Sequence, residues 1–459
     1  MPEILPNSGA YPNSNVAAIN EKVGRYRWTI CSLLFFATTI NYLDRSVISL
    51  LKEDLDIRFH WTESDYAHIV MAFQVSYAVG MLIAGRFIDK VGTKIGYAVS
   101  LILWSLASMG HALVTSTLGF LIARAGLGVS EAGNFPSAIK TTAEWFPKKE
   151  RAYATGIFNS GTNIGAILAP LTVPFIVAKW GWQEAFVITG AFGFIWLIFW
   201  FIYYEIPAKQ KRLSKAEFDY IHSDVDEAEN NPGNVELKSD IEINKRVPWI
   251  KLLKYNQTWA FILGKFLTDP IWWFYLFWLP AFLYAQYGIE GTGVALPVAI
   301  VYTMSTVGSI WGGWLPMYFI KHNWPVFRAR KTSMLIYAFL VIPVVFAQYL
   351  GSINMWLAVF IIGIATSAHQ AWSANIFTTV SDMFPKKTVA SVTGMGGMAG
   401  ALGGLLIAFL AGKLFDHFKA LGNLDTGYYI MFIICGCAYL LAWVLMHILA
   451  PKLKRIDFE

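Results

Sequence analysis

The amino-acid sequence predicts an all-α membrane protein, and three observations support that prediction. Apolar residues make up 56% of the 459 residues and charged residues only 14%, whereas about a quarter of a soluble domain is charged. Apolar runs of about 20 residues, long enough to cross a bilayer as a helix, recur along the chain. Lys and Arg gather in alternate loops between these runs, which is the pattern of cytoplasmic loops.

Twelve apolar runs are expected to form twelve transmembrane helices. They begin near positions 28, 66, 95, 117, 151, 182, 258, 295, 331, 354, 389 and 426. Counted over the short loops and the terminal segments, nineteen Lys and Arg residues lie on one side of the predicted membrane and five on the other, which predicts that both termini are cytoplasmic. The first 26 residues are polar and lack an apolar core before a cleavage site, so we expect no signal peptide.

A charged stretch between the sixth and seventh runs divides the chain into halves, and an internal repeat relates them. Phe146-Pro147-Lys148-Lys149 recurs 238 residues later as Phe384-Pro385-Lys386-Lys387, as expected for parallel structural repeats. The expected units are a cytoplasmic tail (1–26), a six-helix bundle (27–205), a cytoplasmic loop (206–257), a second six-helix bundle (258–450) and a cytoplasmic tail (451–459).

The composition argues against several kinds of partner. The formal net charge of +6 follows from the loop pattern, and no basic block carries interleaved aromatic residues, so we expect no nucleic acid. The cysteines, Cys31, Cys435 and Cys437, all lie in predicted helices, where neither a disulfide nor a metal site is expected. The sequence has no nucleotide-binding loop, and we expect no cofactor and no use of ATP.

The first predicted helix, from Trp28 to Leu51, contains an acid and a base, Asp44 and Arg45. One such charge at the centre of a spanning helix costs about 2.5–3.5 kcal/mol, so the pair requires internal partners or a water-filled cavity. A binding or proton-coupling site is one interpretation. The other is a structural ion pair that holds helices together.

The segment between the second and third predicted helices reads Gly85-Arg86-Phe87-Ile88-Asp89-Lys90-Val91-Gly92-Thr93-Lys94. It fits the pattern G-x-x-x-D-[RK]-x-G-x-[RK] and resembles the loop at this position in major facilitator superfamily transporters. Glycines allow helix ends to approach closely, and the acid can serve a neighbouring helix N-terminus. An ordinary tight turn is the alternative to a cytoplasmic gate, whose expected residues are Gly85, Asp89, Lys90 and Gly92.

The fourth predicted helix places Arg124, Gly128 and Glu131 on one face, because they are four and three residues apart. With a rise of about 1.5 Å per residue, Arg124 lies about 10 Å from the outer end, level with Asp44, and Glu131 lies about 20 Å from it. Arg124 is thus the expected partner of Asp44, whereas Glu131 has no cation within a turn. Structural salt bridges are the alternative for Arg124 and Glu131.

The fifth predicted helix places Asn159, Thr162 and Asn163 on one face near the middle of the membrane, beside glycines that permit close packing. Three hydrogen-bonding groups there suit a hydroxylated ligand. Hydrogen bonds between helices are the alternative.

In the second half, aromatic and polar side chains are expected to line the same cavity. They are Trp272 and Tyr275 on the seventh predicted helix, and His369, Gln370, Trp372 and Ser373 on the tenth. The 238-residue repeat also places His369 at the position of Glu131. Packing or lipid contact is the alternative for the aromatic residues, and packing is the alternative for His369.

These residues resemble one branch of the major facilitator superfamily, the anion:cation symporters, and within it the bacterial hexuronate transporters. The resemblance covers the full length of the chain. Its most specific motifs are Asn41–Ser46, Arg124–Gly128, Glu131–Pro136, Trp145–Pro147, Gly156–Gly161, Leu267–Phe274 and His369–Asn375. The last two are similar to the hexuronate subgroup in particular.

The resemblance implies proton-coupled uptake of an organic anion across the inner membrane. It implies that Arg45 grips the carboxylate and that Asp44 and Glu131 take up protons. It also implies that Tyr42 and Tyr77 help to line the site.

The sequence therefore predicts a symporter, expected as a monomer surrounded by membrane lipid, that imports hexuronates such as glucuronate or galacturonate with protons. We expect a charged first half and a neutral, aromatic second half. Glu131 is expected to be protonated first, and protonation of Asp44 then to release Arg45. Galactonate-type relatives carry glutamine at the position of Thr162, which weakens an aldonate assignment.

Three alternatives stay open. A symporter for another sugar acid, an aldonate or an aldarate, shares the motifs of the first and fourth helices. A sensor that binds its ligand without transport is disfavoured because no soluble output domain is long enough to signal. A membrane-embedded enzyme is disfavoured because no nucleophile, base and orienting residue accompany Glu131 and His369.

Overall fold

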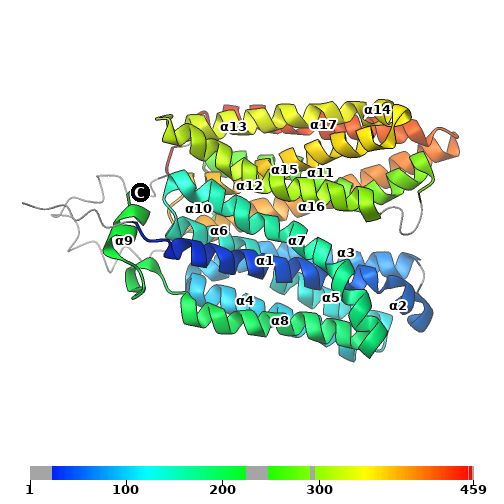
Figure 1. The fold of residues 1–459 in the computed structure, drawn as a ribbon, viewed down its shortest axis with the longest axis horizontal. Helices are drawn as coiled ribbons and strands as arrows, with labels where there is room; N and C mark the ends of the chain where they lie inside the picture. The colour runs from blue at the N-terminus through cyan, green and yellow to red at the C-terminus, as the bar shows by residue number, and fades with distance from the viewer. Residues whose placement is uncertain (1–22, 62, 224–246, 290–294, 453, 457–459) are drawn as a thin grey trace, which may run out of the picture.

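Long α-helices run side by side in two halves of the chain, which form the lower and upper layers of the computed structural model in Figure 1. The structure describes residues 23–61, 63–223, 247–289, 295–452 and 454–456. Parts of the expected N-terminal tail and central loop, residues 1–22 and 224–246, lie outside this range. All regular elements in the described residues are helices.

The first half consists of one short and seven longer helices. They are α1 (Tyr26–Leu50), α2 (Lys52–Phe59), α3 (Glu63–Val91), α4 (Thr93–Gly110), α5 (Thr117–Glu131), α6 (Asn134–Trp145), α7 (Lys148–Trp180) and α8 (Trp182–Tyr203), with a 3₁₀ turn η1 (His111–Leu113). The described part of the linker contains η2 (Pro207–Lys209), α9 (Lys215–Ile221) and α10 (Trp249–Leu252).

The second half repeats this arrangement. Its elements are α11 (Asn256–Tyr287), α12 (Ala295–Lys321), α13 (Val326–Val341), η4 (Ile342–Phe346), α14 (Ala347–Ile353), α15 (Met355–Met383), α16 (Val389–Ala420) and α17 (Leu424–Leu449). The end of the molecule at which α1 begins and α17 ends also carries α9, and we call it the α9 end (Figure 1). The opposite end carries α2 and is called the α2 end.

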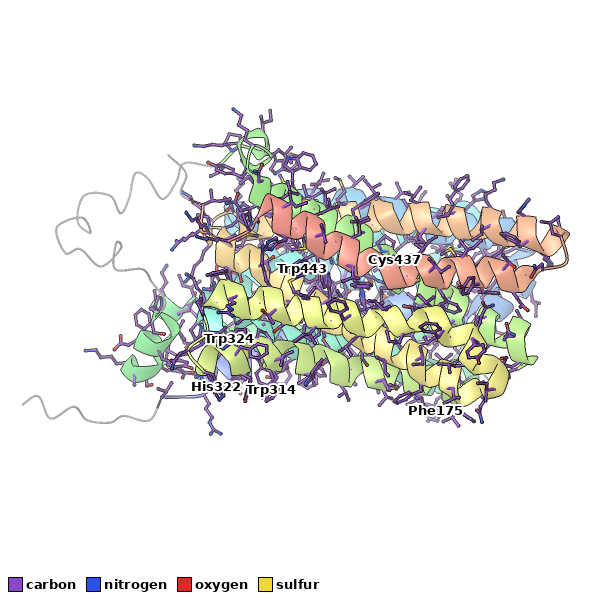
Figure 2. The ribbon with its side chains drawn as sticks, turned by 90° about the horizontal axis from the view of Figure 1, so that it is seen from above. Phe175, Trp314, His322, Trp324, Cys437 and Trp443 are labelled. Atoms are coloured by element: carbon purple, nitrogen blue, oxygen red, sulfur yellow. The ribbon has the colours of Figure 1, made fainter. Side chains whose placement is uncertain are left out.

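Nine helical segments of the described chain are long and apolar enough to cross a membrane. The segments α1, α5 with α6, and α11 fall outside this set, and they carry the charged side chains of the candidate site described below. The twelve spans and the cytoplasmic termini therefore stay predictions. Apolar side chains such as Phe175 and Trp314 project from the outer helix faces, 64% and 41% exposed (Figure 2), as expected for surfaces in contact with lipid.

The two halves meet along two equivalent pairs of helices, α3 with α16 and α7 with α12. In each pair a glycine lies so close to a facing carbonyl that a Cβ atom would overlap the oxygen. The contacts are Gly85 with Ala390, Gly313 with Ala152, Gly394 with Met81, and Gly156 with Ser309. Ala152 and Ala390, like Gly156 and Gly394, are 238 residues apart, so the sequence repeat is also a repeat of contacts.

The linker helix α9 is attached to the first half through Glu217. The buried carboxylate of Glu217 accepts hydrogen bonds from the backbone N–H groups of Tyr26 (3.0 Å) and Arg27 (3.1 Å) and pairs with the Arg27 guanidinium at 3.0 Å. The first N–H groups of a helix have no partner within the helix and favour a negative charge. Glu217 therefore caps α1, and Arg27 extends the contact to Glu150 of α7 at 2.8 Å.

Candidate functional site

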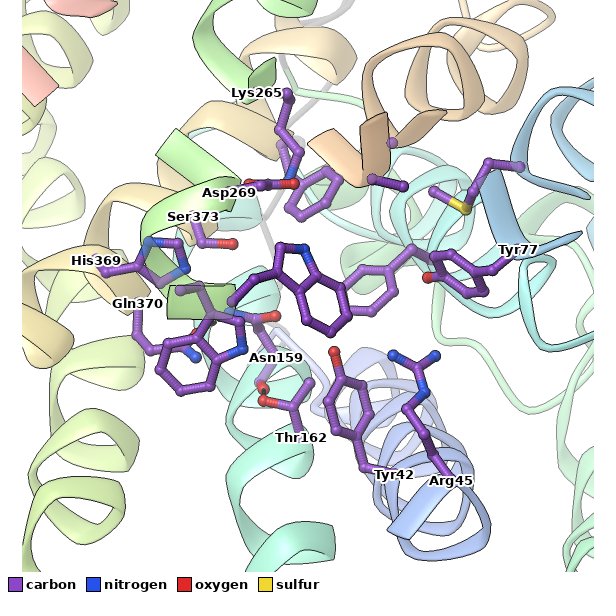
Figure 3. A pocket seen from close by; sticks show the side chains of 17 residues that line it. Tyr42, Arg45, Tyr77, Asn159, Thr162, Lys265, Asp269, His369, Gln370 and Ser373 are labelled. Atoms are coloured by element: carbon purple, nitrogen blue, oxygen red, sulfur yellow. Dashed lines mark hydrogen bonds and ion pairs between the residues drawn. The ribbon is translucent and has the colours of Figure 1, made fainter. Parts of the chain in front are cut away.

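A cavity of about 70 Å³ lies between the two halves. Its wall in the first half is formed by Tyr42, Arg45, Tyr77, Met81, Phe135, Asn159 and Thr162. Its wall in the second half is formed by Lys265, Asp269, Trp272, Trp273, His369, Gln370, Ser373, Phe377, Gly397 and Ala401. Figure 3 shows these side chains converging on the same space from helices of both halves.

Arg45 is the cation of the first wall, and its guanidinium lies among aromatic rings. Its carbon is 4.6 Å from the ring centre of Tyr42 and 4.9 Å from those of Phe73 and Tyr77, distances at which a cation is attracted to the ring faces. Its Nη2 atom is 2.9 Å from the carboxylate of Glu131. The Arg45 side chain is 12% exposed, whereas that of Glu131 is fully buried, so Arg45 stands between Glu131 and the cavity.

The expected pairing of Asp44 with Arg124 is wrong. Asp44 is fully buried and accepts a hydrogen bond from Ser108 Oγ at 3.2 Å, whereas Arg124 donates to the Arg45 carbonyl at 3.3 Å. Equal depth along two helices does not fix the directions of their side chains, because successive residues point about 100° apart around the axis. Asp44 points toward α4, and its neighbour Arg45 meets Glu131 of α5. Neither Asp44 nor Arg124 lines the cavity.

Two of the three expected groups on α7 line the cavity, and one of them joins the halves. Asn159 Nδ2 donates to Gln370 Oε1 of α15 at 2.7 Å. Thr162 also lines the cavity, and its hydroxyl donates to the Asn159 carbonyl at 2.9 Å. Asn163 is fully buried away from the cavity, and neither polar atom of its side chain has a hydrogen-bond partner in the described part of the chain.

The aromatic residues of the second half divide into two groups. The Trp272 and His369 rings stack in parallel at 5.2 Å beside the cavity, and His369 Nδ1 shares a hydrogen bond with the Tyr439 hydroxyl. Tyr275 and Trp372, which were also expected to line the cavity, do not reach it: both are buried among other side chains.

The spacing of the lining residues explains this difference. Lys265, Asp269 and Trp273 on α11, and His369, Ser373 and Phe377 on α15, are four residues apart in each set, which places each set along one stripe of its helix. The expected pairs 272 with 275 and 369 with 372 assume a spacing of three. The stripe actually presented to the cavity is the one with a spacing of four.

The second half is not neutral, contrary to the expectation from its sequence. Lys265 and Asp269 form an ion pair of 2.7 Å inside the cavity wall, and Phe377 lies 3.9 Å from the Lys265 ammonium. A signal was available, because an acid and a base four residues apart in an apolar run meet the criterion that singled out Asp44 and Arg45. Met81, Phe135, Trp273, Phe377, Gly397 and Ala401 also line the cavity and were not predicted.

The candidate gate lies at the α9 end, where Asp89 joins three helices. Its carboxylate is 2.9 Å from the Lys140 ammonium of α6 and accepts a hydrogen bond from the Ser391 backbone N–H of α16 at 2.7 Å. Gly85 lies one turn earlier on α3 in the close contact with α16. Gly92 has a φ of +84°, a backbone conformation that favours glycine, and Lys90 is exposed.

A second charged contact between the halves lies at the same end and was not predicted. Arg330 of α13 pairs with Asp382 of α15 at 2.6 Å and donates to the Lys148 carbonyl of α7 at 2.7 Å. Arg151 of α7 donates to the Ser381 carbonyl at 2.7 Å. These hydrogen bonds, with those of Asp89, hold the halves together at the α9 end.

The cavity and its surroundings define a class of protein. Helices with apolar outer faces enclose, between two repeated halves, a space lined by charged, amide and hydroxyl groups, which is the arrangement of secondary transporters. The chain is thus a membrane transport protein. It belongs to the Major Facilitator Superfamily, whose family model matches residues 34–408, and it is accordingly a multi-pass inner-membrane protein and not an enzyme.

Among the curated proteins similar to this chain are transporters named for sugar acids. The hexuronate transporter of Escherichia coli K12 is 32% identical over 399 residues, which cover 86% of this chain and 89% of the relative. The galacturonate transporter of Dickeya chrysanthemi is 35% identical over 301 residues, covering 66% of this chain and 84% of the relative. The D-galactonate transporter of Escherichia coli O6:H1 is 27% identical over 399 residues, which cover 86% of this chain and 90% of the relative.

Solved structures show the same fold. The proton:xylose symporter XylE superposes with a TM-score of 0.73 at 15% sequence identity, covering 94% of this chain and 97% of that one. The Escherichia coli fucose:proton symporter FucP superposes with a TM-score of 0.67 at 12% sequence identity, covering 93% of this chain and 100% of that one. The expected family and its all-helical fold are therefore confirmed.

Proposed function

We propose that this protein imports hexuronates such as glucuronate and galacturonate together with protons, by alternating access across the inner membrane. The observation that carries the proposal is Arg45, a guanidinium that borders the cavity and is held by a single buried carboxylate, that of Glu131, among the described ion pairs. A guanidinium binds a carboxylate in a planar, two-pronged geometry. The similarity to hexuronate and galacturonate transporters supports the same class of substrate.

The remaining polar groups of the cavity suit the hydroxyls of a sugar acid. Tyr77, Asn159, Thr162, Gln370 and Ser373 all border the space. They come from both halves, so a substrate that bridges them favours a state in which the halves are close together.

Coupling to protons follows from competition for Arg45. In the structure the Glu131 carboxylate pairs with the Arg45 guanidinium at 2.9 Å. A substrate carboxylate that binds the same N–H groups must therefore displace this buried anion. Protonation of Glu131 removes that anion and leaves Arg45 free for the substrate, which makes proton binding and substrate binding favour each other. This revises the order expected from the sequence, in which protonation of Asp44 releases Arg45.

Asp44 is the proposed second proton site. Its carboxylate is fully buried and accepts a hydrogen bond from Ser108. Two protons carried with one monoanion would move net positive charge inward, so uptake would respond to membrane potential as well as to pH.

The inner gate is assigned to the α9 end, which we propose to be cytoplasmic. Release of substrate on that side requires separation of the hydrogen bonds between the halves: Ser391 to Asp89, Arg151 to the Ser381 carbonyl, and Arg330 to the Lys148 carbonyl.

A symporter for another sugar acid is the second candidate function, and one observation favours it. The galactonate transporter aligns over 86% of this chain, so the architecture alone does not separate uronates from aldonates. A transporter-like protein that only senses its ligand would bind it without accumulating it.

Uptake by the purified protein in proteoliposomes tests the proposal. Labelled glucuronate should accumulate when the lumen is more alkaline than the outside, and the accumulation should collapse when a protonophore removes the gradient. Unlabelled galacturonate should compete, and protein-free liposomes provide the control. Accumulation that is the same with and without the proton gradient would refute proton coupling. Binding of glucuronate without uptake would identify a sensor.

A further inference from the structure

The Lys265–Asp269 pair gives the cavity a second charged wall, and its two members are unequally accessible. The Lys265 side chain is 4% exposed and that of Asp269 is 20% exposed, with 2.7 Å between ammonium and carboxylate. The Lys265 ammonium is further covered by the ring of Phe377 at 3.9 Å. A ligand in the cavity therefore meets the carboxylate of Asp269 first, while Lys265 lies behind it.

The position of Asp269 is fixed by its neighbours on two helices. Lys265 precedes it by one turn on α11. On α16, a Cβ atom at Gly400 would run into the Asp269 carboxylate, so the absence of a side chain at Gly400 makes the room that the carboxylate occupies. A carboxylate held between two helices in this way is an oriented hydrogen-bond acceptor.

Asp269 faces Arg45 across the cavity. Figure 3 shows Lys265 and Asp269 on one side of the space and Tyr42 and Arg45 on the other. The cavity therefore has a cationic wall and an anionic wall. Its matching ligand carries a carboxylate at one end and hydroxyl groups, which donate hydrogen bonds to a carboxylate, at the other.

We propose that Asp269 binds the substrate hydroxyls farthest from the carboxylate and thereby restricts the protein to sugar acids with a single carboxylate. The inference rests on the proposed function, since it assumes that Arg45 binds the carboxylate of a sugar acid. A dicarboxylic sugar acid with its first carboxylate on Arg45 directs its second toward Asp269. Two like charges brought together in this way repel each other, whereas hydroxyls at the same place form a charge-assisted hydrogen bond.

Lys265 does not provide an alternative site for the second carboxylate in this arrangement. It is almost inaccessible and already paired with Asp269. Removing the Asp269 charge while keeping its size leaves Lys265 without its anion. Asp269→Asn is therefore expected to convert a wall that repels a carboxylate into one that attracts it.

The test uses two open-chain acids that differ only at one end, galactonate with a terminal hydroxymethyl group and galactarate with a second carboxylate. Both compete against labelled glucuronate in counterflow by the full-length protein in proteoliposomes. In the wild type, half-inhibition by galactarate should need at least about tenfold more ligand than half-inhibition by galactonate. Asp269→Asn should lower the galactarate concentration needed for half-inhibition by about tenfold or more. It should raise the galactonate concentration needed for half-inhibition.

Two further variants separate charge from shape. The double variant Lys265→Gln with Asp269→Asn removes both charges. Its half-inhibitory concentration for galactarate should lie between those of the wild type and of Asp269→Asn. Asp425→Asn, an exposed acid at the start of α17, should behave as the wild type. Thermal stabilisation of the detergent-purified variants by each acid measures binding even where counterflow is lost.

The outcomes distinguish this inference from the proposed function. A wild type that exchanges no sugar acid refutes the proposed function. A wild type that exchanges glucuronate but accepts galactarate as readily as galactonate overturns the role of Asp269 alone. The same conclusion follows if galactarate neither competes with nor stabilises Asp269→Asn better than the wild type.

Discussion

At the scale of single residues, the chemistry of the cavity depends on which acid holds Arg45. The answer in the structure is Glu131, at 2.9 Å, and not the adjacent Asp44. This assignment gives the two acids different parts to play. In the proposed mechanism, Glu131 competes directly with a substrate carboxylate for the guanidinium, whereas Asp44 is a proton site that does not contact it.

Arg45→Lys should abolish most transport although the protein still inserts. An ammonium keeps the charge but lacks the planar fork that binds a carboxylate through two bonds, and the loss of one charged hydrogen bond corresponds to about a tenfold to hundredfold weaker interaction. Glucuronate counterflow at matched protein amounts is the measurement. Arg328→Lys, at an exposed position, is the control, and wild-type apparent affinity in Arg45→Lys would place Arg45 outside the binding site.

Glu131→Gln should lose proton-driven accumulation but keep substrate counterflow, because a neutral amide imitates the protonated acid and leaves Arg45 available. Asp44→Asn should lose accumulation as well, since it removes the second proposed proton site. Comparing accumulation under a pH gradient with counterflow at equal pH separates the two activities. Full accumulation in both variants would rule out these acids as the proton carriers.

At the scale of helices, the repeat in the sequence becomes a repeat of close contacts. Gly85 and Gly313 each allow a backbone carbonyl of the other half to approach at the α9 end. Such contacts transmit the movement of one half directly to the other, because packed helices resist compression. They are therefore the points at which small changes in side-chain size should alter the balance between open and closed states.

Gly313→Ala should favour separation of the halves at the α9 end, since overpacking a tight contact costs about 1–3 kcal/mol. A cysteine introduced by Ala401→Cys in the cavity wall reports the change through its rate of labelling by an impermeant thiol reagent in inside-out vesicles. The rate should rise. Gly412→Ala, where a Cβ meets no neighbour within 4 Å, is the control, and an equal rate in both would show that the contact at Gly313 does not limit opening.

Glu217→Gln should loosen the linker helix α9 from the first half. It replaces the buried carboxylate that caps α1 and pairs with Arg27, a change worth about 1–3 kcal/mol. Limited proteolysis of the linker should become faster while the transmembrane part stays intact. Asp219→Asn, exposed on the same helix, is the control, and unchanged cleavage would indicate that other contacts hold α9 in place.

At the scale of the whole molecule, the cavity lies between halves that are held together at the α9 end by charged contacts. Asp89 joins α3, α6 and α16, and Arg330 joins the second half to the first. A transporter that alternates its access must break those contacts that join the two halves in every cycle, so their strength helps to set the population of states open at this end.

Asp89→Asn should shift the population toward states open at the α9 end, because it removes the charge that pairs with Lys140 and receives the Ser391 N–H group. Labelling of Ala401→Cys from that side should become faster, and labelling from the opposite side slower. Asp54→Asn, at an exposed position of α2, serves as the control. Unchanged labelling in Asp89→Asn would identify the segment as an ordinary turn.

Much of the candidate site was predictable because a charge in an apolar run is visible without a structure. Arg45, Asn159, Thr162, Trp272, His369, Gln370 and Ser373 were singled out by residue type and helical spacing, Tyr42 and Tyr77 by resemblance, and all nine line the cavity. The prediction misplaces Tyr275 and Trp372 because residues three and four apart can both share one face of a helix, and periodicity does not choose between the two stripes. Lys265 and Asp269 meet the same criterion as Asp44 and Arg45, but the prediction does not include them.

The sequence by itself determined the class of fold, the division into repeated halves and the set of charges that must find partners inside the membrane. These follow from composition and periodicity, since the cost of burying a charge depends on the residue and its surroundings being apolar. Only the tertiary structure decided that Glu131 and not Asp44 holds Arg45, and that Lys265 and Asp269 form the opposite wall. The partner of a side chain depends on how its helix is rotated and how closely its neighbours approach, and both are set by the packing of all the helices together.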